Sequence, residues 1–247
     1  MLAVAAASQA ADSLGRDWYR GIIRGDVSAK KLALVFTGDE FGESMEPILD
    51  TLKQRKIVAS FFVTGNFLRQ PPLRKLVERA IAEGHYVGPH SDKHLLYAEW
   101  EARKKTLVTE EEFTADLKKN IADLRDVGAL KGDGTVFFIP PYEHYNDDQV
   151  RWAKSMSVTV FNFSPNSGSN RDYIREGDKK FVSSKQLLTD ILMYEKKDPN
   201  GLNGFLLLLH LGSGRKDPFH TKLGKLCDVL SERGYSFERV DRLLREK

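Results

Sequence analysis

Cysteine is almost absent from this chain of 247 residues, which has a single thiol at Cys227. One cysteine excludes an internal disulfide framework and a zinc site built from several thiolates. Any bound metal would therefore need ligands from His, Asp or Glu. Cys227 shares a predicted helical face with Leu223 and Leu230, so we predict a buried structural thiol. The chain also lacks any apolar run near the roughly 20 residues needed for a membrane-spanning helix.

The chain has little net charge, because 38 Lys and Arg stand against 35 Asp and Glu and leave a formal charge of +3. This imbalance is too weak to indicate a nucleic acid or an anionic membrane surface as a partner. No Gly-x-Gly-x-x-Gly or P-loop motif follows the first predicted strand, so the sequence gives no support for nucleotide binding.

Short apolar or β-branched runs alternate with amphipathic stretches along the chain, which predicts an α/β fold with a parallel sheet. The predicted strands are residues 32–36, 57–63, 85–88, 135–139, 158–163, 204–209 and 236–239. The predicted helices are residues 46–55, 72–83, 110–127, 147–156, 184–197 and 221–233. Four consecutive leucines at 206–209 suit a strand that is buried on both faces. The pattern leaves open a closed barrel or an open, doubly wound sheet.

We divide the chain into a lead-in of residues 1–30 and one domain of residues 31–247. The Ala-rich start contains Ser8-Gln9-Ala10, which has the small-x-small form of a signal-peptide cleavage site. This pattern predicts export to the periplasm or the extracellular space. Because no basic segment precedes the apolar stretch, an Ala-rich helical lead-in is the alternative.

Polar side chains follow several of the predicted strands. Asp39 and Glu40 follow the first, His90 and His94 follow the third, and His210 ends the sixth. In a parallel barrel the carboxyl ends of the strands meet at one rim, so we expect these side chains to converge. Two histidines four residues apart lie on one face of a helical turn, and a carboxylate would complete a two-His, one-carboxylate metal site. The alternative is that the histidines are hydrogen-bonded structural residues. At this rim, His210 is interpreted as a general acid.

The order of these motifs resembles that of the polysaccharide deacetylases of the NodB-homology type, carbohydrate esterase family 4. The similarity spans residues 31–244 and is strongest at residues 57–65 (IVASFFVTG), 83–85 (EGH) and 90–94 (HSDKH). Residues 138–142, 162–173 and 206–210 are similar to three further motifs of the family. The resemblance implies a distorted (β/α) barrel of seven or eight strands.

The resemblance also implies a mechanism. A divalent cation, most often zinc, would be held by Asp39, His90 and His94 and would activate a water and polarise the acetyl carbonyl. A carboxylate would accept the water proton, and His210, oriented by Asp172, would protonate the leaving group. The residues implied in substrate binding are Pro141, Tyr142 and Glu143, with the Tyr142 N–H stabilising the oxyanion.

Two departures from the family pattern concern the base. Thr37-Gly38-Asp39-Glu40 stands where the family has Thr-Phe-Asp-Asp, so Asp39 is the base in one register and the metal ligand in the other. We predict Asp39 as the ligand and Glu40 as the base. Ile139 replaces the family arginine that tethers the base, which indicates a rearranged base, with Glu143 or His144 as candidates, or a loss of catalysis.

These observations predict a metal-dependent hydrolase that removes acetyl groups from a polysaccharide or a peptidoglycan-like glycan. One alternative is an amidohydrolase that acts on a non-sugar amide, and another is a non-catalytic, glycan-binding pseudoenzyme. A glycan site should carry exposed aromatic side chains near the rim. The candidates for them are Tyr97, Trp100, Tyr142 and Tyr145.

Overall fold

The computed structural model describes residues 14–132 and 134–245. A curled, largely parallel sheet forms the centre of the molecule. Its strands β8 (Phe205–His210), β3 (Lys31–Gly38), β4 (Ser60–Val63) and β5 (Tyr86–Pro89) run parallel in that order. The short β9 (Ser236–Phe237) pairs with the beginning of β3. Thr37 of β3 lies opposite His210 of β8, so both strands end at the same edge. This edge is the predicted rim.

Further strands curl the sheet into an incompletely closed barrel. The antiparallel strands β1 (Gly15–Arg16) and β2 (Ile22–Arg24) extend it beyond β8, so residues 15–24 of the predicted lead-in join the sheet. The parallel pair β6 (Val136–Phe138) and β7 (Val158–Val160) connects to β2 through a bridge between Ile22 and Phe161. The predicted distorted barrel is confirmed. The predicted signal segment lies outside the described residues.

A side chain replaces a backbone ladder at the gap between β5 and β6. The N–H of Phe137 donates a hydrogen bond of 3.0 Å to the buried hydroxyl of Tyr86. A buried backbone N–H without a partner is costly, so Tyr86 supplies an acceptor that a neighbouring strand would otherwise provide. The Tyr86 side chain of β5 therefore provides a hydrogen bond to β6 across the gap in the barrel.

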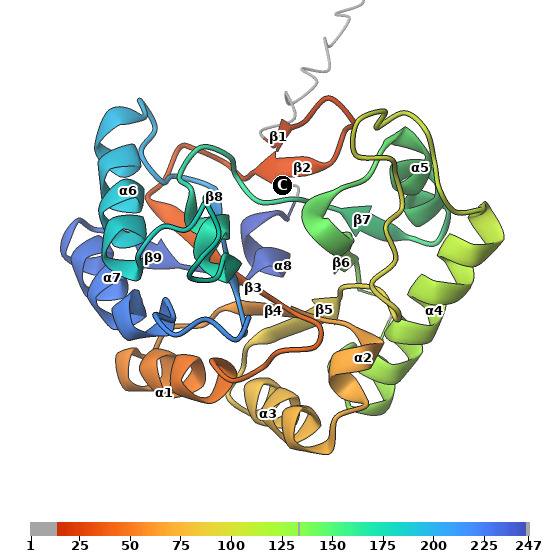
Figure 1. The fold of residues 1–247 in the computed structure, drawn as a ribbon, viewed down its shortest axis with the longest axis horizontal. Helices are drawn as coiled ribbons and strands as arrows, with labels where there is room; N and C mark the ends of the chain where they lie inside the picture. Colours follow the sequence, from red (N-terminus) through yellow and green to blue (C-terminus); the bar gives the residue numbers. More distant parts are fainter. Residues whose placement is uncertain (1–13, 133, 246–247) are drawn as a thin grey trace, which may run out of the picture.

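Helices form an outer layer around the sheet, and β1 and β2 lie on the side that the long helices leave uncovered (Figure 1). The long helices are α1 (Met45–Arg55), α3 (Pro71–Ala82), α4 (Glu110–Asp126), α5 (Asp147–Ser155), α6 (Ser184–Lys197) and α7 (His220–Glu232). Short turns are α2 (Gly65–Leu68), α8 (Val240–Leu243) and the 3-10 turns η1 (Pro141–Glu143) and η2 (Ser169–Tyr173). The predicted helices are confirmed to within one or two residues. None of the helices in the described residues is long and apolar enough to cross a membrane.

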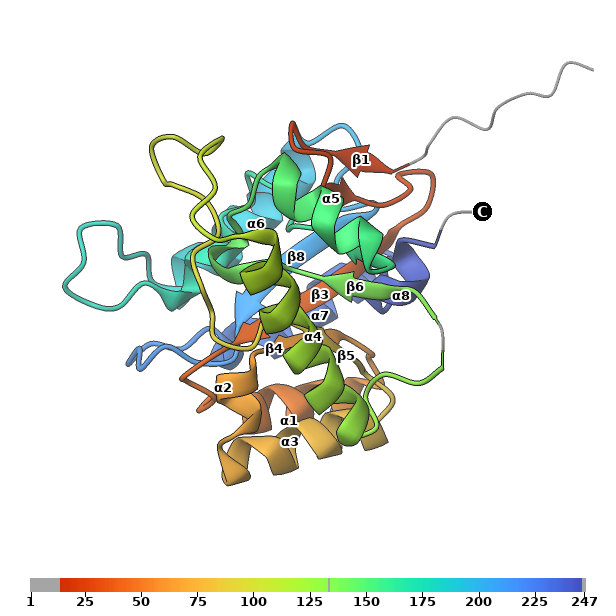
Figure 2. The ribbon, with the colours of Figure 1, turned by 90° about the vertical axis from the view of Figure 1, so that its right-hand side faces the viewer.

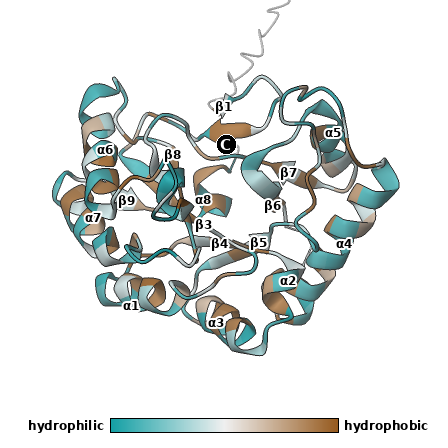
Figure 3. Cartoon of the chain, in the orientation of Figure 1, coloured by the Kyte–Doolittle hydropathy of each residue, from teal (hydrophilic) through white to brown (hydrophobic). Residues whose placement is uncertain are grey.

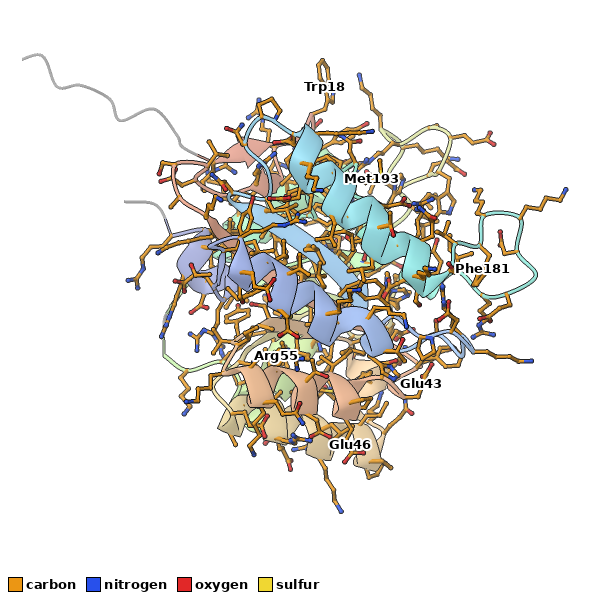
Figure 4. The ribbon with its side chains drawn as sticks, turned by 90° about the vertical axis from the view of Figure 1, so that its left-hand side faces the viewer. Trp18, Glu43, Glu46, Arg55, Phe181 and Met193 are labelled. Carbon is orange, nitrogen blue, oxygen red and sulfur yellow. The ribbon has the colours of Figure 1, made fainter. Side chains whose placement is uncertain are left out.

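Strand β8 is buried on both faces, as its four leucines predict. Leu206 and Leu208 pack inside the barrel, whereas Leu207 and Leu209 pack against the helical layer. The helices turn their apolar residues towards the sheet (Figure 3). Cys227 of α7 is buried there as predicted, and burial raises the pKa of its thiol to about 12. At the surface, Arg55 ties α1 to α7 by donating to both carboxylate oxygens of Asp228 (Figure 4).

The two ends of the barrel differ. The loops that follow the strands project from one side, whereas β1 and α8 lie towards the other (Figure 2). At the beginning of α4, Thr109 and Glu112 form the predicted capping box. The projecting loops are free to carry functional side chains, as in other parallel barrels.

Candidate active site

A cavity of about 790 Å³ opens at the rim where β3, β5 and β8 end. The predicted site residues that line it are Asp39, Glu40, His90, His94, Tyr142, Glu143 and His210. Pro141 is buried beneath the cavity wall, and Asp172 is buried behind His210. The structure therefore brings together side chains that are up to 171 positions apart in the chain, from 39 to 210.

Asp39 follows the last residue of β3 and is held by one of its two oxygens. Oδ1 accepts hydrogen bonds from Thr64 Oγ1 at 2.8 Å and from Asn66 Nδ2 at 3.0 Å. Oδ2 lies 3.7 Å from His94 Nδ1. The carboxylate is thus oriented towards the histidine pair. The sequence interpretation missed Thr64 and Asn66, although both follow β4 directly, and polar residues after a strand were the signal used elsewhere.

His90 lies immediately after β5, and its tautomer is determined by a buried carbonyl. Nδ1 is 2.7 Å from the Ile139 carbonyl oxygen, which can only accept, so Nδ1 carries the hydrogen and Nε2 has a free lone pair. The backbone N–H of His90 donates to Asn120 Oδ1 at 3.0 Å. Burial lowers the pKa of His90 well below its ordinary value, so the ring is neutral at pH 7.

The pair His90 and His94 is carried by an irregular loop, so the predicted helical turn is wrong. Ser91 and His94 have φ of 76° and 56°, in the left-handed region that a right-handed helix cannot contain. The ring centroids still lie only 5.1 Å apart. Burial also lowers the pKa of His94, against the opposing charge of Asp39. The loop, rather than a helix, brings the two imidazoles together.

Helix α4 supports this loop through polar residues on its buried face. Asp116 accepts from the Lys93 N–H and from the Tyr97 hydroxyl, both at 2.9 Å. Asp116 and Asn120 stand in the same apolar stripe as Phe113 and Leu117. We missed both residues, yet a polar side chain at a core-facing helical position is a signal that they bind something buried.

A glycine allows the loop to approach α2. A Cβ on Gly65 would overlap the Asp92 carboxylate, which itself pairs with Arg69 at 2.6 Å. The N–H of Gly65 donates to the Ser91 carbonyl at 3.1 Å. Only a residue without a side chain permits this contact, so Gly65 helps to set the position of the histidine loop.

The chemistry of Asp39, His90 and His94 fits a divalent cation. Two neutral imidazoles and a carboxylate are the nitrogen and oxygen donors that zinc accepts, and the His90 tautomer leaves Nε2 available. Within residues 14–132 and 134–245, however, no three His, Cys, Asp or Glu side chains are already grouped at metal-ligand spacing. The metal therefore stays a prediction from the donor set.

His210, which is partly exposed to the cavity, pairs with the buried Asp172. His210 Nδ1 lies 2.7 Å from Asp172 Oδ1, and the His210 N–H donates to Oδ2 at 2.9 Å. Burial lowers the pKa of His210, but the charge and hydrogen bond of Asp172, together with Glu143, outweigh it and raise the pKa. Asp172 therefore orients the ring and favours the protonated imidazole, the arrangement expected from the sequence.

The turn η1 places Tyr142 and Glu143 on the cavity wall in an unusual backbone conformation. Their φ values are 58° and 53°, in the left-handed region. The Glu143 carbonyl accepts from Asn162 Nδ2 at 2.9 Å. Burial raises the pKa of the Glu143 carboxyl to about 7, against the opposing effect of His210. Glu143 thus stands within electrostatic reach of His210.

The other candidates for the base are placed less favourably. His144 does not line the cavity, because its Nε2 lies 3.0 Å from the Glu99 carbonyl oxygen and its ring stacks on Trp100. Glu40 is exposed at the cavity mouth. The Ile139 side chain packs inside the barrel. Within the described residues, the Thr37 hydroxyl, which faces the cavity, is buried without a partner.

Two of the four predicted rim aromatics are exposed. Trp100 and Tyr142 expose 56% and 45% of their surface, and their rings lie 5.8 Å apart. Tyr97 and Tyr145 are completely buried, so their prediction as rim residues is wrong. Both pack in the cluster beneath α4, where their apolar rings gain more from burial than from solvent. Tyr173, which was not predicted for this role, is half exposed with its ring 5.0 Å from that of His210.

The sequence profile of a family described as polysaccharide deacetylase matches residues 24–161. The chain belongs to the polysaccharide deacetylase family. This deacetylase-family chain is 26% identical to a peptidoglycan-N-acetylglucosamine deacetylase of Bacillus cereus, over 88% of the chain and 90% of that protein.

Solved structures of family 4 carbohydrate esterases share the fold of this polysaccharide deacetylase family member. PdaA of Bacillus subtilis has a TM-score of 0.69 at 22% identity, covering 92% of this chain and 85% of that one. A pseudoenzyme of the same esterase family from Bacillus anthracis has a TM-score of 0.71 at 21% identity, covering 93% and 70%. The shared fold thus includes both an esterase and a pseudoenzyme.

Proposed function

We propose that the protein is a metal-dependent deacetylase that removes acetyl groups from a polysaccharide or a peptidoglycan-like glycan, in the periplasm or the extracellular space. The observation that carries the proposal is the placement of the His210–Asp172 pair on the same cavity as Asp39, His90 and His94. The two groups interact, because the charge of His210 acts on both histidines of the loop. Hydrolysis of an acetyl group needs a general acid for the leaving group and a Lewis acid for the carbonyl oxygen. His210 would be the first, and a metal held by the donor set would be the second.

Asp39, His90 and His94 are the residues that would hold the cation. When bound, a zinc ion there would polarise the acetyl carbonyl and lower the pKa of a water. Thr64 and Asn66 keep one oxygen of Asp39 occupied and so direct the other into the cavity. The Ile139 carbonyl keeps the His90 lone pair at Nε2 available in the same way.

His210 would act when the carbon–nitrogen or carbon–oxygen bond of the acetyl group breaks. Its Nδ1 is engaged by Asp172, so the proton for the leaving group comes from Nε2. The raised pKa of His210 favours the protonated imidazole that supplies this proton. The backbone N–H of Tyr142, at the left-handed turn, would donate to the developing oxyanion.

The cavity walls suit a sugar ring. Trp100 and Tyr142 present exposed rings on one side, and the half-exposed Tyr173 lies beside His210. Aromatic faces stack on the apolar faces of sugars while leaving hydroxyl groups to water. This favours a glycan over a small non-sugar amide as the substrate.

Acetate release tests this proposal. The purified, zinc-loaded protein is incubated with acetylated chitooligosaccharides, acetylated xylan and peptidoglycan fragments, and His90→Ala serves as the matched inactive control. We expect release from at least one glycan, abolished by the substitution and by a chelator. Absence of His90-dependent release from every substrate would falsify the esterase assignment.

A non-catalytic, glycan-binding role is the second candidate. It is favoured by Ile139, whose side chain lies in the barrel core where the family resemblance places an arginine. A pseudoenzyme would bind a glycan saturably without releasing acetate at any pH. Calorimetric titration with the same oligosaccharides, run beside the acetate assay, separates this candidate from the enzyme.

A further inference from the structure

No residue of β3 itself carries a carboxylate. The residue that pairs with His210 across the strands is Thr37, whose side chain also lines the cavity. A threonine hydroxyl does not take up a proton at neutral pH, so it cannot serve as a general base. Asp39, two residues further along, has both carboxylate oxygens engaged. Oδ1 accepts hydrogen bonds from Thr64 and Asn66, and Oδ2 faces His94. Glu40, the next residue, is exposed at the cavity mouth, so we look for the base on another element.

Glu143 is the carboxylate that η1 brings to this place. It lines the same cavity as His210, and each group acts electrostatically on the other. Two hydrogen bonds hold its backbone, since its N–H donates to the Pro140 carbonyl at 2.9 Å and its carbonyl accepts from Asn162. A glutamate in a left-handed conformation is held there by its surroundings, and such strain is typical of functional positions.

We infer that Glu143 is the general base of the deacetylation, in place of an acid at the end of β3. The inference rests on the proposed function. The burial that raises the pKa of Glu143 to about 7 supports it, because a base works best when its pKa is near the working pH. Glu40, the base predicted from the sequence, is exposed and has no comparable environment.

The proton and bond changes balance without any further reactant. Glu143 takes a proton from water while the water oxygen bonds to the acetyl carbonyl carbon. The bond from that carbon to the sugar nitrogen then breaks, its electron pair goes to the nitrogen, and His210 gives the nitrogen a proton. Transfer of the Glu143 proton to His210 restores both groups. The products are the free amine and acetic acid, which gives its own proton to the amine or to water and leaves as acetate.

The active form carries an ionised Glu143 and a protonated His210. The charges that act on Glu143 come from His210 of β8 and Asp172 of η2, and the charge of Glu143 in turn acts on Tyr173 of η2. The rate should rise with pH as Glu143 ionises and fall again as His210 loses its proton. If Glu143 were purely structural, its replacement by glutamine would leave kcat and the pH profile of the rate unchanged.

The test compares three substitutions in the full-length, zinc-loaded protein. Glu143→Gln keeps the shape and removes the base. Glu143→Gly removes the side chain and suits the left-handed backbone, so it adds no backbone strain, and its urea unfolding curve is compared with that of the wild type. Glu46→Gln makes the same chemical change at an exposed residue of α1, labelled in Figure 4, that does not line the cavity.

We expect both Glu143 variants to lose kcat by about 100-fold or more, as for other general bases. KM should change by less than about threefold and the rising limb of the pH profile should vanish. Glu46→Gln should match the wild type. An active wild type whose Glu143→Gln variant keeps both its kcat and its rising limb overturns this inference alone. A wild type that releases no acetate from any glycan overturns the proposed function and this inference together.

Discussion

The pair of His210 and Asp172 allows a prediction that does not depend on knowing the substrate. In Asp172→Asn the side chain keeps its size but loses its charge. The structure shows two contacts from this carboxylate to the same residue, 2.7 Å to the ring and 2.9 Å to the backbone N–H. Because burial alone lowers the pKa of His210, removal of the opposing charge should move the pKa from above to below its ordinary value.

The magnitude follows from the charge-assisted hydrogen bond. Such a bond to a buried partner contributes about 1.5–3 kcal/mol, which corresponds to a loss of roughly 10- to 100-fold in a rate that needs protonated His210. Stability should change with pH in a defined direction. The pairing of protonated His210 with Asp172 stabilises the folded protein. This stabilisation is fully present below the unfolded-state pKa of histidine, about 6.5, and is lost as pH rises through the folded-state pKa of His210. The variant should therefore be destabilised most at acidic pH.

Histidine-selective NMR titration measures the pKa directly. His85 serves as the internal reference, since its pKa of about 4 is set by burial on the opposite end of the barrel. Asp178→Asn, the same change at an exposed position, is the control variant. An unchanged pKa for His210 in Asp172→Asn, with a normal His85 signal, would refute the reasoning about the pair.

Three further predictions concern the donor set, the rim and the barrel gap. His90→Ala should weaken zinc binding by at least about 100-fold in equilibrium dialysis, and an unchanged affinity would place the metal elsewhere. Trp100→Ala should raise KM for a glycan about tenfold with little change in kcat, whereas Trp18→Ala, at an exposed position outside the cavity lining, should do neither. Tyr86→Phe leaves the Phe137 N–H without its acceptor and should lower the free energy of unfolding by about 1–3 kcal/mol in urea; a loss under about 0.5 kcal/mol contradicts the role given to the hydroxyl.

Hydrophobic periodicity and helix caps were sufficient to predict most of the fold. The six long helices and the central strands could be located because their signals are local, as with the Thr109 capping box and the leucine run of β8. The elements missed in the sequence were short ones, such as β1, β2 and α2. Two or three paired residues carry too little pattern to be recognised without the neighbouring strand that stabilises them.

The sequence by itself determined that His90, His94 and His210 lie at or just after strand ends and that an acidic residue does too. Because parallel strands end at one edge of a sheet, it also determined that these residues would lie at the same edge. Only the tertiary structure decided how these side chains are used. It placed the histidine pair on an irregular loop with positive φ values, left His144 outside the cavity lining and buried Tyr97. It also placed Glu143 on the same cavity as His210. The physical reason is that side-chain direction in a loop depends on contacts with distant elements, such as Asp116 of α4 beneath the loop. Local pattern does not contain those contacts.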